Sequence, residues 1–442
     1  MGGAPSFPIP ILFVVTALLA ATLLAALRRV EGRAARFVIA AVWARYILSV
    51  FHTVTYDQAF AGFSWNAIGS IAITAAGFLV IQPRHLMLKA LFPVYAIILL
   101  VLTSAALNEG IVTALDSVVK YGYFIVVMVA AYEALRQNGP ERFFGPLLWA
   151  FAPLLVFQLL SIATGTVKAS ELDGSVSYIG GYNHEAAFSV ALATFFVVAC
   201  FTETLRKPLK AALLLILIIG IALANYRTTI IALLPLAALQ TVSGTVLSFR
   251  RDQRVILFLV MAVVAFAAIA ILALQASDRF ADLALFLGDP GQFIKPQHEF
   301  SIEERRLLSG RAYIWSGYIF TWLDASTLRH LFGFGPDSWE NWFKVYPHNT
   351  LVAFLFELGV AGLAALLLFW AAMLGQALRA RGAVRYDLVF AHLSFILMNL
   401  ATMALWQVEG IILYAIVCGY SLFSAVEAGA PRYQVGSRRA RA

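Results

Sequence analysis

Residues 209–240 read LKAALLLILIIGIALANYRTTIIALLPLAALQ, and this stretch decides the class of fold. It consists of two long apolar runs that are separated by a short polar turn, Asn225-Tyr226-Arg227. An apolar run of about 20 residues is long enough to cross the hydrocarbon core of a bilayer as an α-helix. The stretch therefore predicts two membrane-spanning helices with almost nothing between them.

Apolar runs of this kind recur along the whole chain of 442 residues. Hydrophobic residues make up 61% and charged residues only 13%, whereas a soluble protein is about 45–50% apolar and about 25% charged. This composition excludes a cytosolic enzyme. It predicts an all-α polytopic membrane protein with about 12–13 transmembrane helices, the lower number applying if one terminal run does not span. The apolar runs lie at residues 8–27, 37–53, 65–82, 90–107, 115–135, 145–163, 183–201, 209–225, 228–249, 255–275, 349–375, 388–405 and 410–428.

The runs divide the chain into four parts. Residues 1–275 are expected to form a bundle of transmembrane helices, and residues 349–428 the C-terminal transmembrane helices. Between them lies one long hydrophilic loop, residues 276–348, and a basic tail, residues 429–442, ends the chain. The loop is rich in aromatic residues, which argues against disorder and favours a loop that contains short helices.

One such helix is predicted inside the long loop. Apolar side chains recur at helical spacing between Gly310 and Leu323. Such a stripe suits a helix that lies in the membrane interface over the bundle. It suits equally well a helix that packs on a core formed by the loop itself, and both interpretations stay open at this point.

Lysine and arginine are distributed unevenly between alternate loops. One set of short loops and the C-terminal tail hold most of them, whereas the opposite short loops hold only Lys168 and Arg227, with Lys120 near a helix end. Because positively charged loops stay in the cytoplasm, this asymmetry places the tail inside and residues 276–348 on the outer face of the membrane. The net charge of +8 is therefore explained by membrane topology, and nucleic acid is not an expected partner.

The sequence carries none of the common signatures of metal, nucleotide or serine chemistry. The 2 cysteines lie inside apolar runs, which excludes a disulfide scaffold, a cysteine-rich zinc site and an iron–sulfur cluster. HExxH, GxSxG and phosphate-binding glycine motifs are missing, and the expected outer loops lack DxD. We therefore expect neither a metal nor another cofactor.

A histidine at the start of a predicted helix is the first candidate for catalysis. Residues 346–351 read YPHNTL and lead into the apolar run at 349–375. Pro347 forces a turn, and Asn349 or Thr350 can cap the helix. A helix N-terminus favours anions over imidazolium, so His348 is expected to be neutral and able to act as a general base. A capping role is the alternative, and His184, which also precedes an apolar run, is a second candidate.

Arginines on the same predicted face are the candidates for binding an anion. Arg227 stands in the turn between two apolar runs, where its guanidinium can bind phosphate oxygens or can simply snorkel to water as an anchor. Arg305, Arg306 and Arg311 cluster in the long loop. Alternatively, these arginines form a solvated face and pair with nearby glutamates.

One charged residue lies well inside a predicted span. Arg45 interrupts the second apolar run, and charges within a membrane are usually paired and functional. Its partner could be a structural acid, of which Glu357 and Glu133 are examples. Glu357 follows His348 by nine residues, which places it on the opposite helix face. We therefore expect Glu357 to form a structural ion pair rather than to orient His348.

The C-terminal half carries an ordered series of motifs. It begins with Arg227 and continues through Ser309-Gly310-Arg311, Trp315, the segment LFGFGP at 331–336, His348-Asn349-Thr350-Leu351, and Glu357 with Gly359 and Gly362. In this order the motifs resemble the O-antigen ligase and polymerase superfamily of bacterial envelope membrane proteins. The resemblance covers residues from about 210 to about 375.

The resemblance implies a GT-C-like glycosyltransferase in the bacterial inner (cytoplasmic) membrane that works on the periplasmic face. Its donor would be a glycan on undecaprenyl diphosphate, and it would need neither metal nor nucleotide, because the lipid diphosphate is the leaving group. His348 would activate the acceptor hydroxyl, Arg227 and Arg311 would neutralise the diphosphate, and the anomeric centre would invert. Which loop arginine is essential stays open. The further residues expected at the substrates are Arg305, Arg306, Asn349, Trp315 and His184.

A ligase and a polymerase share this donor and differ in acceptor, which is a lipid A-core glycan for the first and a growing polysaccharide for the second. Polymerases tend to carry two arginine-bearing outer loops, and residues 164–182 hold only Lys168, which favours a ligase. The segment GGYNH at 180–184 resembles exopolysaccharide polymerases and favours the second. A lipid-linked glycan transporter is the non-enzyme alternative. It would be expected to place basic residues inside the helices, where only Arg45 qualifies.

Overall fold

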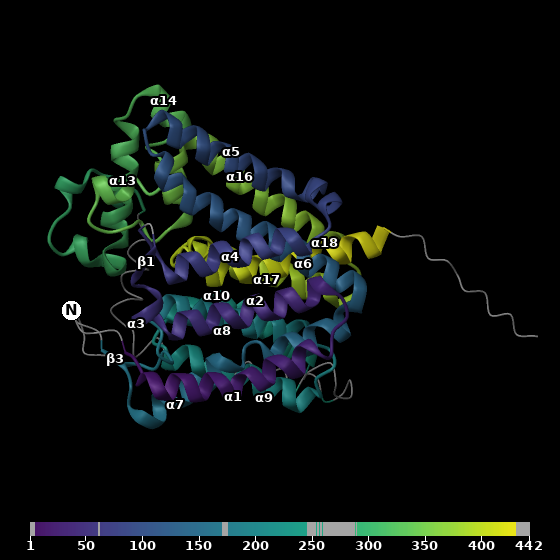
Figure 1. The fold of residues 1–442 in the computed structure, drawn as a ribbon. Helices are drawn as coiled ribbons and strands as arrows, with labels where there is room; N and C mark the ends of the chain where they lie inside the picture. The colour runs from purple at the N-terminus through teal and green to yellow at the C-terminus, as the bar shows by residue number, and fades with distance from the viewer. Residues whose placement is uncertain are drawn as a thin grey trace, which may run out of the picture.

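The protein is an almost entirely helical bundle (Figure 1). The computed structural model describes residues 5–60, 62–169, 176–244 and 290–429, together with residues 253, 256, 259 and 288. Two short antiparallel hairpins are the strands in this part of the chain: β1 (Gln58–Phe60) pairs with β2 (Phe63–Ser64), and β3 (Lys168–Ala169) with β4 (Val176–Ser177). The predicted all-α polytopic membrane fold is confirmed.

Twelve of the predicted apolar runs fall on described residues, and each coincides with helix. The run at 145–163 includes the end of one helix and most of the next, the run at 228–249 is described as far as residue 244, and the run at 255–275 lies outside the described residues apart from residues 256 and 259. The long helices are α1 (Ile9–Leu27), α2 (Arg33–Val50), α4 (Trp65–Val80), α5 (Phe92–Leu107), α6 (Ile111–Trp149), α7 (Ala152–Thr164), α8 (Glu185–Phe201), α9 (Lys207–Leu223), α10 (Arg227–Gly244), α16 (Thr350–Arg379), α17 (Ala383–Asn399) and α18 (Val408–Gly429).

Five helices in the described ranges are long and apolar enough to cross a membrane by themselves. They lie at Ile9–Leu27, Lys89–Leu107, Thr113–Thr164, Thr350–Arg379 and Val408–Gly429. Three shorter apolar helices, α4, α8 and α10, accompany them. The multi-pass character therefore follows from the structure, whereas the number of 12 or 13 spans stays a prediction.

The two ends of the bundle differ in what they carry (Figure 1). Residues 290–349 and the turn at 224–226 lie at one end, which we call the loop end. The turns at 28–32, 202–206 and 380–382 lie at the other, together with the end of α18, and we call it the basic end. For these turns the fold agrees with the alternation of loops that the arginine and lysine pattern predicts. The side of the membrane that each end faces stays a prediction, and the basic tail from residue 430 lies outside the described residues.

Short helices fill the loop segment, as predicted. They are α13 (Arg311–Leu323), α14 (Thr327–Phe332), α15 (Trp339–Trp342) and three 3-10 turns at Pro290–Phe293, Gln297–Glu299 and Glu304–Gly310. Tyr318 of α13 is 1% exposed, and its ring stacks on Phe343 at 3.9 Å and meets Phe356 of α16 edge-on at 5.1 Å. Its hydroxyl donates to the Val345 carbonyl at 2.8 Å. The core under this helix is thus shared between the loop segment and α16, and whether the helix also lies in the membrane interface stays a prediction.

The charge inside the second span finds a different partner from those expected. Arg45 pairs with Glu409 of α18, with Nη2 to Oε1 at 3.1 Å, and Ser49 donates to the same oxygen at 3.0 Å. Glu133 instead contacts His85 at 2.6 Å. The expected examples, Glu357 and Glu133, were therefore wrong, because the fold brings together two side chains whose residues are 364 positions apart in the chain.

Candidate active site

The start of α16 is built by a polar turn and a side-chain cap. Asn349 is the N-cap, and its Oδ1 accepts from the backbone N–H groups of Leu351 at 2.9 Å and Val352 at 3.4 Å. Thr350 instead donates to Asn399 Oδ1 of α17 at 2.8 Å. Because Asn349 satisfies the first free N–H groups of the helix, His348 is not needed as the cap.

His348 stands just outside the helix in a backbone conformation that few side chains adopt. Its φ of 54° lies in the left-handed region, which is uncommon for residues other than glycine. The turn is held from outside the helix: Trp315 Nε1 of α13 donates to the Pro347 carbonyl at 2.8 Å. The Tyr346 ring lies 4.0 Å from the imidazole, centroid to centroid. Such strain is characteristic of functional positions, because the surrounding fold must maintain it.

The imidazole of His348 is neutral at pH 7. Its partial burial, together with the positive charge of Arg311 and the nearby His184, lowers its pKa to about 4. Burial disfavours the charged form, and a neighbouring cation acts in the same direction. The prediction of a neutral histidine is consistent with this environment, although the main cause is burial rather than the helix field. The same interactions show that Arg311 and His184 lie within electrostatic reach of His348.

Arg311 also links the start of α13 to the group that contains His348 and His184. It is the first residue of α13, after Gly310 with a φ of 78°. Its charge opposes the effect of burial, which raises the pKa of Tyr346 and of Tyr226. Tyr226 directly precedes Arg227, the first residue of α10. The turn before α10 and the starts of α13 and α16, distant in sequence, therefore lie within electrostatic reach of one another at the loop end.

Among the described residues, the two candidate arginines have no carboxylate partner. Arg227 is exposed and Arg311 is half-buried. Within the part of the chain that the structure describes, no carboxylate forms an ion pair with either guanidinium. The start of α10 is itself fixed, since Thr229 is fully buried and shares a hydrogen bond of 2.9 Å with Ser189 of α8. Uncompensated guanidinium groups on anchored helix starts suit phosphate oxygens.

Arg305 and Arg306 behave differently from Arg311. Arg305 donates from Nε to the Phe300 carbonyl at 3.2 Å, and its guanidinium lies 5.4 Å from the Tyr313 ring centroid. Arg306 is exposed, and neither residue is among the charges that act on His348. Pairing of these arginines with the glutamates at 303 and 304 is not observed among the described residues, since Glu304 pairs with Lys295 at 2.8 Å. The geometry thus favours Arg311 as the loop arginine of the site.

The loop before α8 is the remaining segment near His348. His184 caps α8, with its Nδ1 accepting the Ala186 N–H at 3.1 Å. Partial burial lowers its pKa, an effect that the adjacent Glu185 opposes. Glu185 is paired with Lys168 at 2.9 Å. His184 therefore belongs to the neighbourhood of His348, but its Nδ1 already accepts a hydrogen bond from the start of α8.

Sequence reasoning assigned no role to three residues of this neighbourhood. Tyr346 and Tyr226 flank His348 and Arg227 in the chain, and adjacency to a candidate residue was the available signal. Glu185 adjoins His184 in the same way. Their importance depends on where they meet in space, and no local pattern carries that information.

The glycine motifs join the loop segment to α16. Gly359, with a φ of 67°, breaks α16, and there the N–H groups of Phe334 and Gly335 donate to the carbonyls of Phe356 at 2.9 Å and Glu357 at 3.0 Å. A Cβ on Gly333 would lie 2.2 Å from the carbonyl carbon of Glu357. Only glycine permits this approach. The contact between residues 333–335 and the break in α16 at Gly359 is called the glycine joint below.

Among the described residues, Glu357 does not form the structural ion pair that was expected. Its side chain is 2% exposed, and Oε1 has no hydrogen-bond partner among the described residues. Its backbone carbonyl accepts from Gly335 N–H and, at 2.8 Å, from Ser104 of α5. The residue contributes to the joint through its main chain.

The site coincides with a region that is similar to known proteins. Residues 212–367 match the family model described as O-antigen ligase. The match includes Arg227, Arg311, Trp315, the glycine joint and His348, whereas His184 lies outside it. No curated protein matches the chain at a significant level. The resemblance to the O-antigen ligase and polymerase superfamily is thereby confirmed over this region.

Proposed function

We propose that this protein, whose residues 212–367 match the O-antigen ligase family model, is a metal-independent, inverting glycosyltransferase. Its donor is a glycan linked to undecaprenyl diphosphate, and its acceptor is a sugar hydroxyl. The observation that carries the proposal is the turn that leaves the imidazole of His348 outside the cap of α16, neutral and within electrostatic reach of Arg311. A base and two free cations are what an acceptor hydroxyl and a departing diphosphate require.

In the proposed reaction the acceptor oxygen attacks the anomeric carbon of the donor. The new bond from this carbon to the acceptor oxygen forms as the bond to the diphosphate oxygen breaks. His348 takes the acceptor proton, and the electron pair leaves with the lipid diphosphate, whose charge Arg227 and Arg311 stabilise. Direct displacement inverts the anomeric centre.

The acceptor is proposed to be a lipid A-core glycan, which corresponds to a ligase. A polymerase would be supported by a second free cation on the loop before α8. Lys168, the basic residue of that loop, is paired with Glu185 and with the Asn183 carbonyl at 3.1 Å. This pairing favours the ligase, with a growing polysaccharide as the alternative acceptor.

A lipid-linked glycan transporter is less well supported than an enzyme. Transport of an anionic lipid needs accessible basic groups within the bundle. Arg45, the candidate for such a group, is 4% exposed and is neutralised by Glu409. Its role is therefore assigned to a buried ion pair between α2 and α18.

The test is transfer in vitro by the full chain, with a purified glycan on undecaprenyl diphosphate as donor. Two acceptors, lipid A-core and a second lipid-linked glycan, are offered separately in the presence of EDTA. We expect transfer to lipid A-core that EDTA does not reduce. Transfer only to the second acceptor would support the polymerase, and no transfer to either would contradict the proposed function.

The site is proposed to face the periplasm from the bacterial inner membrane. His298 at the loop end is 81% exposed at its side chain, and the native Cys200 and Cys418 are buried. His298→Cys should therefore react with an impermeant thiol reagent in intact, outer-membrane-permeable cells, and Arg381→Cys at the basic end should not. The reverse pattern would contradict the orientation.

A further inference from the structure

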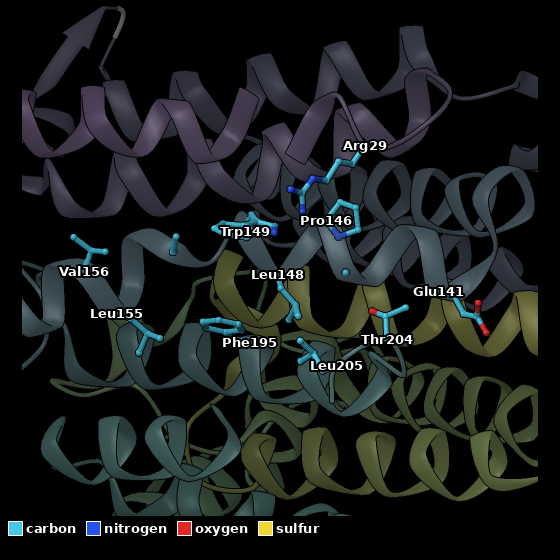
Figure 2. Close-up of a pocket in the computed structure, with 12 residues that line it drawn as sticks. Arg29, Glu141, Pro146, Leu148, Trp149, Leu155, Val156, Phe195, Thr204 and Leu205 are labelled. Atoms are coloured by element: carbon cyan, nitrogen blue, oxygen red, sulfur yellow. The ribbon is translucent and has the colours of Figure 1, made fainter. Parts of the chain in front are cut away.

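A groove far from the candidate active site opens near the basic end of the bundle. It has a volume of about 590 Å³ and is lined by the last residues of α6, the first turns of α7, Phe195 of α8 and the turn after α8 (Figure 2). This volume falls within the range of about 300–1,000 Å³ that is typical of small-molecule sites. His348 and its neighbours, at the loop end, contribute nothing to it.

The groove changes from apolar to polar along its length. Val156, Leu155 and Phe195 line one part, and Glu141 and Thr204 lie toward the opposite end, with Arg29 between (Figure 2). Its apolar part extends along α7 away from the basic end, which is the direction of the bilayer centre. The groove therefore has the same polarity gradient as one leaflet of the membrane that surrounds it.

A break in α6 creates the space. Gly139, with a φ of 70°, precedes Pro140 and interrupts the helix, so residues 141–149 form a separate short piece. Within that piece a Cβ on Gly145 would lie 3.3 Å from Thr204 Oγ1. The small residues at 145 and 152 thus keep the groove open between α6, α7 and the turn after α8.

The mouth of the groove carries one cation and one anion. Arg29 is exposed, and its Cζ lies 5.8 Å from the centroid of the Trp149 ring, which holds the guanidinium over the groove. Glu141 is also exposed. In the described part of the chain neither side chain forms an ion pair. A guanidinium suits a phosphate, and a carboxylate suits an ammonium group.

We propose that the groove binds one phosphatidylethanolamine molecule from the leaflet at the basic end. One acyl chain lies along Phe195, Leu155 and Val156, the phosphate contacts Arg29, and the ammonium group faces Glu141. An acyl chain gains little by leaving bulk lipid for an apolar groove. Retention of the lipid therefore depends on its headgroup, and the carboxylate selects a zwitterionic lipid over an anionic one. This site does not depend on the proposed reaction.

The full chain is reconstituted in nanodiscs of phosphatidylethanolamine and phosphatidylglycerol, transferred to a delipidating detergent and analysed by native mass spectrometry. We expect one retained phosphatidylethanolamine per chain. Arg29→Gln should reduce this retention about tenfold, since a charge-assisted hydrogen bond is lost. Glu141→Gln should remove the preference over phosphatidylglycerol. Equal retention of both lipids by the parent protein would contradict the assignment of the headgroup.

Two substitutions test the position of the acyl chain. Ala152→Phe fills the groove from α7, and Val156→Trp does so from an exposed position that tolerates a larger ring. Both should abolish the retained lipid, whereas Ala21→Phe, on the exposed surface of α1 and away from the groove, should not. Unchanged retention in Ala152→Phe and Val156→Trp would overturn the proposed site.

Discussion

Two histidines precede helices at the loop end, and they meet those helices differently. His184 is itself the N-cap of α8, with extended backbone and with Nδ1 accepting a backbone N–H. At α16 the cap is Asn349, and His348 stands one residue outside with a φ of 54°. Because Asn349 caps α16, the imidazole of His348 does not have to accept a hydrogen bond from the helix.

The two imidazole rings also differ in their exposure and in the charges around them. The side chain of His184 is 51% exposed and has the carboxylate of Glu185 at 3.8 Å. His348 is half-buried, faces the charge of Arg311 and makes no hydrogen bond to a described residue. A partly desolvated, unbonded imidazole can accept a proton from a substrate, whereas one that accepts a backbone N–H is occupied.

The largest predicted effect is therefore a difference between the two histidines. His348→Ala should lower glycan transfer by about 10²–10⁴ because general-base assistance is lost. His184→Ala should change transfer less than about tenfold and should cost about 1 kcal/mol of stability through loss of a cap. The measurements are transfer rates in vitro and thermal unfolding of both variants. Equal losses of transfer would remove the distinction between them.

The pH dependence of the parent protein sharpens the same comparison. His348 acts in its neutral form, so transfer should fall as the pH is lowered through its depressed pKa of about 4. An acidic limb near the unperturbed histidine pKa of about 6.5 would point to a more exposed histidine as the base. The profile of kcat/KM reports the free enzyme and is the appropriate measurement.

A smaller effect is expected from the arginines. Arg227→Lys and Arg311→Lys keep the charge but lose the planar fork, and each should lower transfer at least about tenfold while the protein stays in the membrane. Arg306→Lys is the matched control in the same loop and should transfer at the parent rate. If Arg311→Lys transferred at the same rate as the control, Arg311 would not be the loop arginine that stabilises the diphosphate. Arg305 would then become the next candidate.

The smallest effect concerns the hydrogen bond that holds the turn before His348. Trp315→Phe keeps the ring in α13 and removes the Nε1 donor to the Pro347 carbonyl. A hydrogen bond of this kind contributes about 0.5–1.5 kcal/mol, so transfer should fall about two- to tenfold. Trp342→Phe, at an exposed position of the same segment, is the control. An unchanged rate in Trp315→Phe would show that Tyr346 and the cap suffice to position the imidazole.

Several features of the protein follow from the sequence alone because they depend on neighbouring residues. Helix length follows from the length of an apolar run, and the helix at Arg311–Leu323 follows from a stripe at helical spacing. The start of α16 follows from Pro347 and a capping asparagine. Alternation of basic loops follows from the distribution of charge along the chain.

Tertiary structure decided the features that join distant segments. The partner of Arg45 is Glu409, 364 residues away, which no local pattern indicates. Arg311, rather than Arg305 or Arg306, acts on His348, because the packing of α13 on α16 sets which arginine faces the turn. Local sequence determines where a helix begins and ends, since hydrogen bonds and caps reach only a few residues. Which helix starts share a site is determined by the packing of whole helices, because that packing sums many contacts between segments far apart in the chain.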